Sequence, residues 1–588
     1  MAAREGLKAE GRGAAISPSP EGAFATLRAM SEAQTDVLVV GAGPTGLTLA
    51  SELLRQGLTV RIIDAAEAPS PWSRAVVVHA RTLEVLGQVG CVDALVARGT
   101  KVRGATLWSA GETLARVEFD ELDTPFPYVL CLSQQETEAV LHDALVARGG
   151  AVERGVRLTS FRQDGTGVTA RLVRGEEELT VRAAWIVGCD GAHSVVRKAL
   201  DQPFEGSTYE ERFQLADLKI DWDTRDDRIT TYFADDGIVA CFPLPGGRWR
   251  LVATDVGEAT EAPTADEVEA LFHRRTGSGA KLSDMVWSSR FRIHCRQVAS
   301  YRDDRALLAG DAAHIHSPAG GQGMNTGIQD AHNLAWKLSL VHKGYARSKL
   351  LDTYHEERHA VGQSVLRGTD AATKVAVVRS AAARGVRDEL ARFLTSLEVV
   401  QQRVATELTE LTVNYERSSL SLEHKTSVLQ GRLGTAAGGE TPTVASVRAF
   451  DKAPAAGRRA KDGHATVAGE PGTRSLFAVL DARRFNVLLF DGRSDSADGY
   501  QRFAAIASVL AERFPDAVDV TVITPRTTRP AELPEKICVV LDPDGELEAR
   551  YGATTECVYI LRPDLYVGYR AQPVDEDKIV AWLKTVLR

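Results

Sequence analysis

The chain has 588 residues, of which 44% are hydrophobic and 25% charged, and its formal net charge is −9. This length predicts roughly three or four domains. Acidic and basic residues are interspersed, which argues against nucleic acid as a partner. No apolar run approaches the roughly 20 residues that cross a bilayer, so no membrane partner is expected either. The seven cysteines show no CxxC or Cys/His spacing. They predict buried thiols in a reducing, cytoplasmic setting and no metal site.

The N-terminal segment, residues 1–34, is rich in Ala, Gly, Ser and Glu and lacks the apolar core of a signal peptide. We expect it to be flexible and to carry no chemistry.

A dinucleotide fingerprint follows. A strand, a glycine-rich turn, a helix and a second strand are predicted at 36–40, Gly41-Ala42-Gly43-Pro44-Thr45-Gly46, 47–56 and 59–64. In such a unit, Gly41 makes the tight turn, Gly43 lets a pyrophosphate approach the backbone, and Gly46 lets helix and strand pack closely. Asp64 ends the second strand, where an acid can accept ribose hydroxyls.

Two arginines lie in the next segment. Arg74 and Arg81 carry guanidinium groups that suit a phosphate or a polar ring edge, although a solvated helix face is the simpler interpretation. A strand over 128–132 then leads into a helix near Gln134, and residues 151–182 alternate in the manner of a β-meander.

A second strand that stops at a turn is predicted at 184–188, followed by Asp190-Gly191 and a helix. A turn of this kind can hold a pyrophosphate or a pyridine nucleotide, but it is also an ordinary β-turn. From 213 to 296 the pattern is antiparallel, and such a sheet can form one wall of an aromatic pocket.

A third glycine motif begins after the apolar run 306–309. Gly310-Asp311 opens a loop that continues through Gly320-Gly321-Gln322-Gly323, and Asn325 or Thr326 is predicted to cap a helix. Close backbone approach and a helix N-terminus suit a large, flat, partly anionic ligand. The alternative is a glycine-rich surface loop between packed elements.

The rest of the chain is predicted to be helical from about 327 to 425, irregular over 431–475, and α/β from 476 to the end. A hairpin near the C-terminus contains Leu561-Arg562-Pro563-Asp564.

The order of the three motifs resembles the group A flavoprotein monooxygenases of the para-hydroxybenzoate hydroxylase fold. The resemblance covers about residues 36–375, and the C-terminal part is similar to the phenol hydroxylase and aromatic polyketide hydroxylase branch. It implies an α/β protein: a Rossmann-like FAD-binding domain, an antiparallel-sheet substrate domain and a C-terminal thioredoxin-like α/β domain. The expected divisions are a flexible segment (1–34), the first part of the FAD-binding domain with some substrate-domain insertions (35–212) and the substrate domain (213–296). They continue with the second part of the FAD-binding domain and a helical region (297–430), a linker arm (431–475) and the thioredoxin-like domain (476–588).

The resemblance also implies where the cofactor lies. FAD is expected to contact the three motifs and neighbouring positions: Gly41, Gly43, Pro44, Thr45, Gly46, Asp64, Arg74, Arg81, Gln134, Asp190, Gly191, Gly310, Asp311, Pro318, Gly321, Gly323, Met324 and Asn325. Gly492-Arg493-Ser494-Asp495 stands where a redox thioredoxin carries CxxC. A structural or dimer-forming role for that domain is therefore favoured over disulfide exchange.

The implied activity is hydroxylation of a phenolic or polycyclic aromatic, polyketide-type substrate with NADPH or NADH and O2, through a flavin C4a-hydroperoxide. Candidates for a base, a polar network or a ring contact are His316, Pro318, Tyr232, Arg292 and His294. For the tyrosine, the arginine and the histidines, an ordinary structural role is the more frequent interpretation. The alternatives are epoxidation, Baeyer–Villiger insertion and a non-catalytic flavin-binding protein. A homodimer is the candidate assembly.

Overall fold

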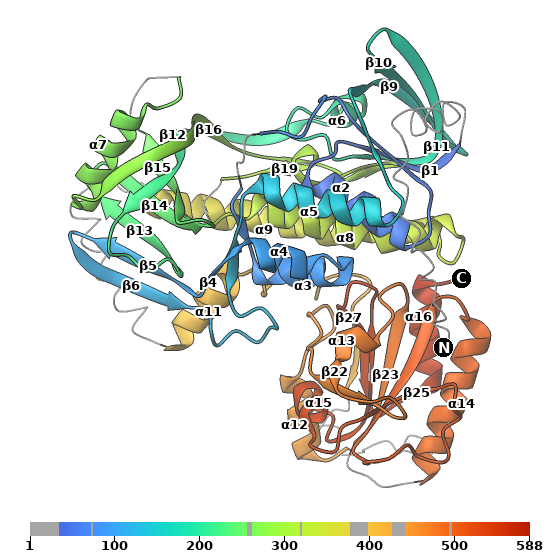
Figure 1. The fold of residues 1–588 in the computed structure, drawn as a ribbon. Helices are drawn as coiled ribbons and strands as arrows, with labels where there is room; N and C mark the ends of the chain where they lie inside the picture. The colour runs from blue at the N-terminus through green and yellow to red at the C-terminus, as the bar shows by residue number, and fades with distance from the viewer. Residues whose placement is uncertain are drawn as a thin grey trace, which may run out of the picture.

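A computed structural model describes residues 34–588 with six gaps, at 72–74, 256–260, 318–319, 377–397, 426–441 and 493–496. The N-terminal segment, Arg74 and Pro318 therefore lie outside the described residues, as does the stretch beyond Gly492 in the C-terminal domain. Figure 1 shows a larger body that holds the first two sheets and the long helices, with the C-terminal domain beneath it.

The first sheet carries the fingerprint. Its strand order is β17-β18-β11-β1-β2-β8, and β1 pairs in parallel with both β2 and β11. Its main strands are β1 (Thr35–Val40), β2 (Val60–Asp64), β8 (Val152–Arg154), β11 (Glu177–Gly188), β17 (Arg302–Asp303) and β18 (Ala306–Leu308), with β9 (Val156–Asp164) and β10 (Gly167–Arg174) extending β11. The central strands are buried, which explains their continuous apolar runs.

Helices cover this sheet and connect it to the rest of the chain. α2 (Pro44–Arg55) packs against α5 (Gln134–Ala147) and α8 (Gly323–His342). The other elements of this body are α3 (Ala80–Val89), α4 (Val92–Arg98), α6 (Val195–Ala199), α9 (Asp352–Ala376), α11 (Glu398–Leu408), and a small sheet of β3 (Val77–Val78), β7 (Val129–Cys131) and β4 (Thr100–Val102).

The antiparallel sheet has the order β19-β16-β12-β15-β14-β13-β5-β6. Its strands are β5 (Gly104–Ser109), β6 (Glu112–Glu118), β12 (Phe204–Asp221), β13 (Arg228–Ala234), β14 (Gly237–Leu244), β15 (Arg248–Asp255), β16 (Lys281–Val298) and β19 (His314–Ile315). One face packs on α7 (Ala265–Thr276) through Val239 and Phe272. The opposite face packs Phe213 and Phe291 near Leu366 of α9.

The C-terminal sheet has the order β20-β27-β26-β23-β24-β25-β21-β22, with β23, β24 and β25 parallel. Its elements are β20 (Leu422–Lys425), α12 (Val444–Lys452), β21 (His464–Val467), β22 (Arg474–Ser475), α13 (Leu476–Val479), β23 (Phe485–Gly492), α14 (Ala497–Arg513), β24 (Val518–Thr524), β25 (Cys538–Leu541), α15 (Glu546–Tyr551), β26 (Thr555–Leu561), β27 (Val567–Gln572) and α16 (Glu576–Val586).

This arrangement corrects the predicted linker arm. The described part of 431–475 contains α12, β21 and β22, and β21 pairs with β25 as part of the C-terminal sheet. Thr443 begins α12 with a capping box to Ser446. These elements are only two to nine residues long, too short to show a clear period in the sequence.

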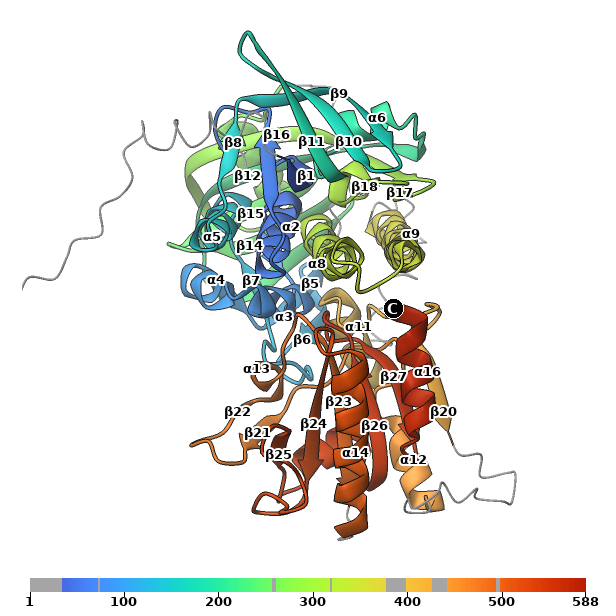
Figure 2. The same cartoon turned by 90° about the vertical axis from the view of Figure 1, so that its right-hand side faces the viewer.

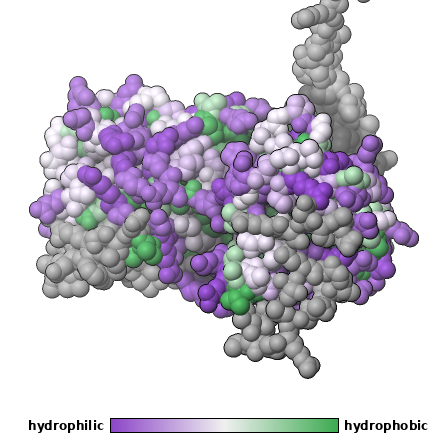
Figure 3. Space-filling model, turned by 90° about the horizontal axis from the view of Figure 1, so that it is seen from below, coloured by the Kyte–Doolittle hydropathy of each residue, from purple (hydrophilic) through white to green (hydrophobic). Residues whose placement is uncertain are grey.

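Six of the seven cysteines are buried, and Cys538 is half-buried. None of the seven forms a disulfide, and burial raises the pKa of Cys131 to about 12. Among the described residues no group of three or more His, Cys, Asp or Glu side chains could hold a metal ion. Within that same part of the chain, no helix is long and apolar enough to cross a membrane. The face in Figure 3 is mostly hydrophilic, and apolar residues show there as small separate spots.

Candidate functional site

The first two motifs meet at Gly41. This glycine has a φ of +101°, and a Cβ added to it would lie 2.4 Å from the Cys189 carbonyl oxygen and 2.8 Å from Asp190 Cα. Only glycine fits such an approach of two backbones at positive φ. The fingerprint turn therefore lies directly against the Asp190-Gly191 turn.

The first and third motifs meet at Thr45. A Cβ on Gly310 would lie 2.6 Å from Thr45 Oγ1, and a Cβ on Gly327 would lie 2.3 Å from the same oxygen. Thr45 is at the start of α2, and Gly327 is in the early part of α8. Three segments that are far apart in sequence are thus brought to one place.

Two helix N-termini lie at this junction. No side chain caps α2 or α8, and neither helix has an acidic residue in its first turn. Free N–H groups and the positive ends of two helix dipoles favour an anion. Above the fingerprint turn there is room for one, because a Cβ on Gly43 would meet no atom within 4 Å.

Asp64 and Gln134 lie beside the same turn. The Asp64 carboxylate accepts hydrogen bonds from the backbone N–H groups of Ala42 (2.7 Å) and Ala66 (2.8 Å). Gln134 donates to Glu138 at 2.8 Å. Burial raises the pKa of Glu138, and the nearby Asp64 adds to this rise. These polar groups form one cluster at the end of β2, where the sequence predicted the ribose contact.

The second motif adds a hydrogen-bond acceptor to the start of α6, whose N-cap is Ser194. Asp190 Oδ2 accepts from the backbone N–H of Val195 at 2.7 Å, at the start of α6. The other oxygen, Oδ1, is buried and has no hydrogen-bond partner among the described residues. Burial raises the pKa of Asp190. Gly191 has a φ of +75° and open space at its Cβ position, so this turn also leaves room for a ligand.

Asn325 holds the glycine-rich loop instead of capping the helix. Its Nδ2 donates to the carbonyls of Val77 and Gly321, both at 2.8 Å, and its Oδ1 accepts from the backbone N–H of His79 at 2.9 Å. The predicted cap is therefore wrong: α8 begins at Gly323, with Gln322 before it. Long-range partners on β3 occupy the Asn325 side chain, so it does not serve the helix end.

His79 and His316 frame this loop. His79 Nε2 lies 2.9 Å from the Gly320 carbonyl, and His316 Nδ1 lies 2.9 Å from the Ser317 carbonyl. Burial lowers the pKa of each imidazole to about 4, so both are neutral near pH 7. Their other nitrogens, His79 Nδ1 and His316 Nε2, are buried without a partner among the described residues.

Three more predicted positions belong to this loop region. The Asp311 side chain is exposed at the junction, next to the buried Gly310. Gly321 has a φ of +67°, and its Cβ position is 3.2 Å from Val77 Cβ, which holds the loop against β3. Met324 is half-buried against the core of the first domain.

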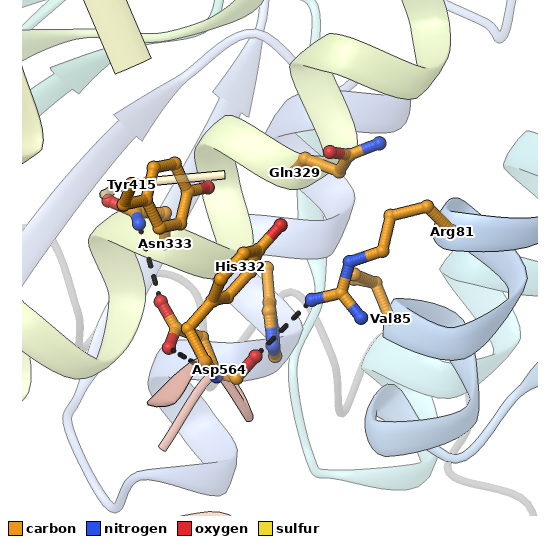
Figure 4. A pocket seen from close by; sticks show the side chains of 8 residues that line it. Arg81, Val85, Gln329, His332, Asn333, Tyr415 and Asp564 are labelled. Atoms are coloured by element: carbon orange, nitrogen blue, oxygen red, sulfur yellow. Dashed lines mark hydrogen bonds between the residues drawn. The ribbon is translucent and has the colours of Figure 1, made fainter. Parts of the chain in front are cut away.

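The structure gives Arg81 a different position from the predicted one. Its guanidinium donates to Glu84 at 2.8 Å and to the Asp564 carbonyl at 3.3 Å, and it lies 4.9 Å from the centre of the Tyr566 ring. Figure 4 shows it pointing toward Asp564. Arg81 thus contacts the C-terminal domain, and we assign it to that interface instead of to FAD.

Three predicted catalytic candidates lie on the face of the antiparallel sheet that is turned away from α9. Tyr232 is opposite Val239, whose side chain packs on α7, and it stacks on Trp108 at 6.1 Å between ring centres. Arg292 and His294 are exposed and alternate with Phe291, which faces α9. The structure therefore turns the Tyr232 side chain away from α9. β16 pairs at Arg296 and Gln297 with β19, which leads into the glycine-rich loop, but the Arg292 and His294 side chains are exposed. Of the candidates within the described residues, His316 is the one with a buried nitrogen without a partner at this loop, and Pro318 lies outside those residues.

Sequence reasoning missed a buried group beneath the third motif. Asp330 accepts from the Gly310 backbone N–H at 3.1 Å, lies 2.7 Å from His314 Nε2 and pairs with Arg358 Nε at 2.6 Å. Burial alone would raise the pKa of Asp330, but Arg358 and His314 hold it below its usual range. An apolar helix pattern gives no signal for such a partnership, because its members meet only in three dimensions.

These motifs identify a class of protein. The family model described as an FAD binding domain matches residues 34–369. The chain belongs to this family, the group A flavoprotein monooxygenases, and it is an FAD-dependent monooxygenase. The predicted family and fold class are confirmed.

Two individual relatives are monooxygenases named for particular substrates. The chain is 34% identical to 6-methylpretetramide 4-monooxygenase from Streptomyces rimosus over 94% of this chain and 93% of the relative. It is 37% identical to pentachlorophenol 4-monooxygenase from Sphingobium chlorophenolicum over 58% of this chain and 64% of the relative.

Solved structures agree over nearly the full length. OxyS, the anhydrotetracycline hydroxylase from Streptomyces rimosus, superposes with a TM-score of 0.69 at 30% identity and covers 94% of this chain and 99% of its own. Aklavinone-11 hydroxylase, solved with FAD and aklavinone, gives a TM-score of 0.71 at 25% identity and covers 94% of this chain and 98% of its own.

The residues present fit FAD. The open space above Gly43 and Gly191 and the uncapped start of α2 suit a pyrophosphate. The uncapped start of α8 suits negative charge at the glycine-rich loop. The buried nitrogens of His79 and His316 without a partner lie at the glycine-rich loop and leave hydrogen-bonding capacity there for a polar ligand.

Proposed function

We propose that the substrate of this monooxygenase is a phenolic or polycyclic aromatic compound of polyketide type, that NADPH or NADH supplies the electrons and that O2 supplies the oxygen. The observation that carries the proposal is the convergence of the three motifs, combined with near full-length similarity to 6-methylpretetramide 4-monooxygenase. Hydroxylation of an aromatic ring is the reaction that this combination favours.

FAD, when bound, supplies hydride acceptance and oxygen activation. The protein has to hold it and tune its charge. Backbone N–H groups at the start of α2 would bind its anionic pyrophosphate. The N-terminus of α8 points its dipole into the loop that Asn325 holds. It would stabilise negative charge there by roughly 1–2 kcal/mol.

Neutral histidines suit this loop. His316 and His79 each carry a pKa of about 4, so neither adds a positive charge to the site near pH 7. A neutral imidazole can both donate and accept a proton, and His316 is therefore our candidate for a polar contact with a phenolic hydroxyl.

The antiparallel sheet supports an aromatic substrate. Its face turned toward α9 carries Phe213, Ile238 and Phe291. Aromatic and aliphatic walls bury a flat substrate and exclude water from the reacting ring.

Basic groups near the second motif support a nicotinamide co-substrate. His294 lies within electrostatic reach of Arg296, Arg292 and His193, and His193 follows the Asp190-Gly191 turn. Clustered basic groups attract the phosphates of NADPH or NADH. This gives Arg292 and His294 a role at the surface in place of the predicted catalytic one.

The decisive experiment measures flavin reduction by NADPH and NADH with a panel of phenols and aromatic polyketides, together with product masses. A substrate that accelerates reduction and gains one oxygen without a change in ring count supports hydroxylation. Ring expansion would indicate Baeyer–Villiger insertion, an epoxide would indicate epoxidation, and no acceleration by any compound would favour a non-catalytic flavin protein.

Asp311→Ala tests the cofactor assignment. We expect loss of FAD with retention of the folded chain, because the Asp311 side chain is exposed. Stoichiometric FAD in the purified variant would contradict the assignment. A homodimer stays our prediction for the assembly, and sedimentation of the holoenzyme measures it.

A further inference from the structure

A loop of the C-terminal domain lies buried in the FAD-binding domain. Arg562 donates to Glu357 of α9 through two bonds of 2.6 and 2.9 Å, and it also pairs with Asp564. Asp564 Oδ2 in turn accepts from Trp336 Nε1 at 3.1 Å and from Asn333 Nδ2 at 3.3 Å, both on α8. Figure 2 shows the C-terminal domain directly beneath α8 and α9.

The charges of this cluster are balanced inside the protein. Glu357, Lys337 and Arg562 have side chains that are 0% exposed. Lys337 Nζ lies 2.7 Å from Glu357 Oε2. Burial opposes ionisation of Glu357, but Arg562 and Lys337 keep its pKa well below its usual range. A group of this kind fixes the relative position of its elements, because removing one member leaves a buried charge without compensation.

The neighbouring residue on α9 continues the network toward the cofactor motif. Arg358 follows Glu357 directly and is also fully buried. Its Nη1 donates to the Tyr415 hydroxyl at 3.0 Å, its Nη2 to the Thr326 carbonyl in the first turns of α8 at 3.1 Å, and its Nε to Asp330 at 2.6 Å. Asp330 accepts the backbone N–H of Gly310.

A small cavity lies at the same interface. Its eight lining residues come from α3, α8, the segment after α11 and the C-terminal loop, and they are Arg81, Val85, Gln329, His332, Asn333, Tyr415, Asp564 and Tyr566. Its volume is about 10 Å³, close to that of one water molecule and far below the roughly 300 Å³ of a typical ligand pocket. The interface is thus a packed contact with room for water and no site for a second cofactor.

We propose that the C-terminal domain positions the FAD site. In this proposal the Arg562-Pro563-Asp564 loop, through α9 and Arg358, holds Asp330, and Asp330 holds the Gly310 backbone and the start of α8. Arg562, Asp564 and Tyr415 are positioning residues, since each acts through another side chain. The inference rests on the family's FAD and is independent of the substrate proposed above.

The first test compares two tyrosines in the full-length chain. Tyr415→Phe removes the hydroxyl that accepts from Arg358 but keeps the ring that packs 4.3 Å from Tyr566. Tyr566→Phe is the matched control, because its hydroxyl donates to the Val413 carbonyl outside the network. We expect Tyr415→Phe to raise the Kd for FAD about fivefold and to shift the visible spectrum of the bound flavin. The control should change neither.

The second test compares two buried aspartates of the C-terminal domain. Asp564→Asn weakens the contacts to Arg562 and α8, whereas Asp542→Asn weakens a carboxylate that accepts the backbone N–H of Glu548 within the domain. Both variants should lower the melting temperature, but only Asp564→Asn should raise the Kd for FAD. The proposal is overturned if Tyr415→Phe or Asp564→Asn matches its control variant in FAD affinity and flavin spectrum, because the interface would then be structural alone. If Asp564→Asn does not fold, the tyrosine pair decides.

Discussion

The cofactor loops and the interdomain cluster use polar groups in opposite ways. At the loops, Asp190 Oδ1 and His316 Nε2 are buried without partners among the described residues, and the space above Gly43 is open. In the cluster, Glu357 alone receives bonds from Arg562, Lys337 and Ser418. The first region keeps capacity for a ligand, and the second has its charges paired within the protein.

This difference teaches which contacts serve binding and which serve position. A buried polar atom without a partner costs free energy, so its presence in a folded protein calls for an explanation such as a ligand. A cluster whose charges are paired with one another fixes the geometry of the elements that carry them. Mutations at the cofactor loops should therefore mainly change the affinity for FAD, and mutations in the interdomain cluster should mainly change the stability of the fold.

The largest effect is expected from Glu357→Gln, which removes a charge from the interdomain cluster. Arg562 and Lys337 would lose their common counter-charge in a fully buried place. We expect the free energy of unfolding to fall by about 3–5 kcal/mol, as measured by denaturant unfolding. Glu416→Gln is the control, because its pair with Arg458 is exposed, and it should change stability by less than about 1 kcal/mol. Equal effects would contradict the buried-charge argument.

Gly43→Ala should weaken FAD binding at the cofactor loops without lowering the stability of the folded chain. Gly43 has a φ of −79° and free space at its Cβ position, so the folded chain should tolerate alanine within about 0.5 kcal/mol. The methyl group would occupy the space of the pyrophosphate and weaken FAD binding about tenfold or more, by titration. Gly46→Ala differs, since its Cβ would lie 1.9 Å from the Gly41 carbonyl oxygen, and it should impair folding itself. Unchanged FAD affinity in Gly43→Ala would refute the placement.

The neutral histidines sharpen the comparison through pH. Burial lowers the pKa of His79 and His316 to about 4 in the folded chain, from about 6.5. Between these values the unfolded chain binds more protons, so stability falls as the pH decreases from about 6.5 to 4. Unfolding midpoints across this range should show the decline. His316→Gln should make it shallower, and a curve that stays parallel to that of the original chain would argue against a buried neutral His316.

The smallest effect is expected from Tyr232→Phe. Tyr232 faces α7, and burial raises its pKa to about 12, so it is not a base at neutral pH. Substrate-stimulated NAD(P)H oxidation should change by less than about twofold, as for a substitution outside the reacting groups. A much larger loss of NAD(P)H oxidation would indicate that Tyr232 acts in the reaction.

The sequence by itself determined the motifs, the family and the fold class. Gly41, Gly46 and Gly310 are readable in one dimension because each meets a strict local demand of backbone angle or close approach. The strands next to them are buried, and their apolar runs report that burial directly.

Tertiary structure decided which side chains face the site and which do not. The strand register places Tyr232 on the face toward α7, and Arg81 donates to the Asp564 carbonyl of the C-terminal loop instead of making the expected cofactor contact. Asn325 found partners on β3 instead of capping its helix. These outcomes depend on groups that are distant in sequence, and a local pattern cannot specify the direction of a side chain whose partner comes from another domain.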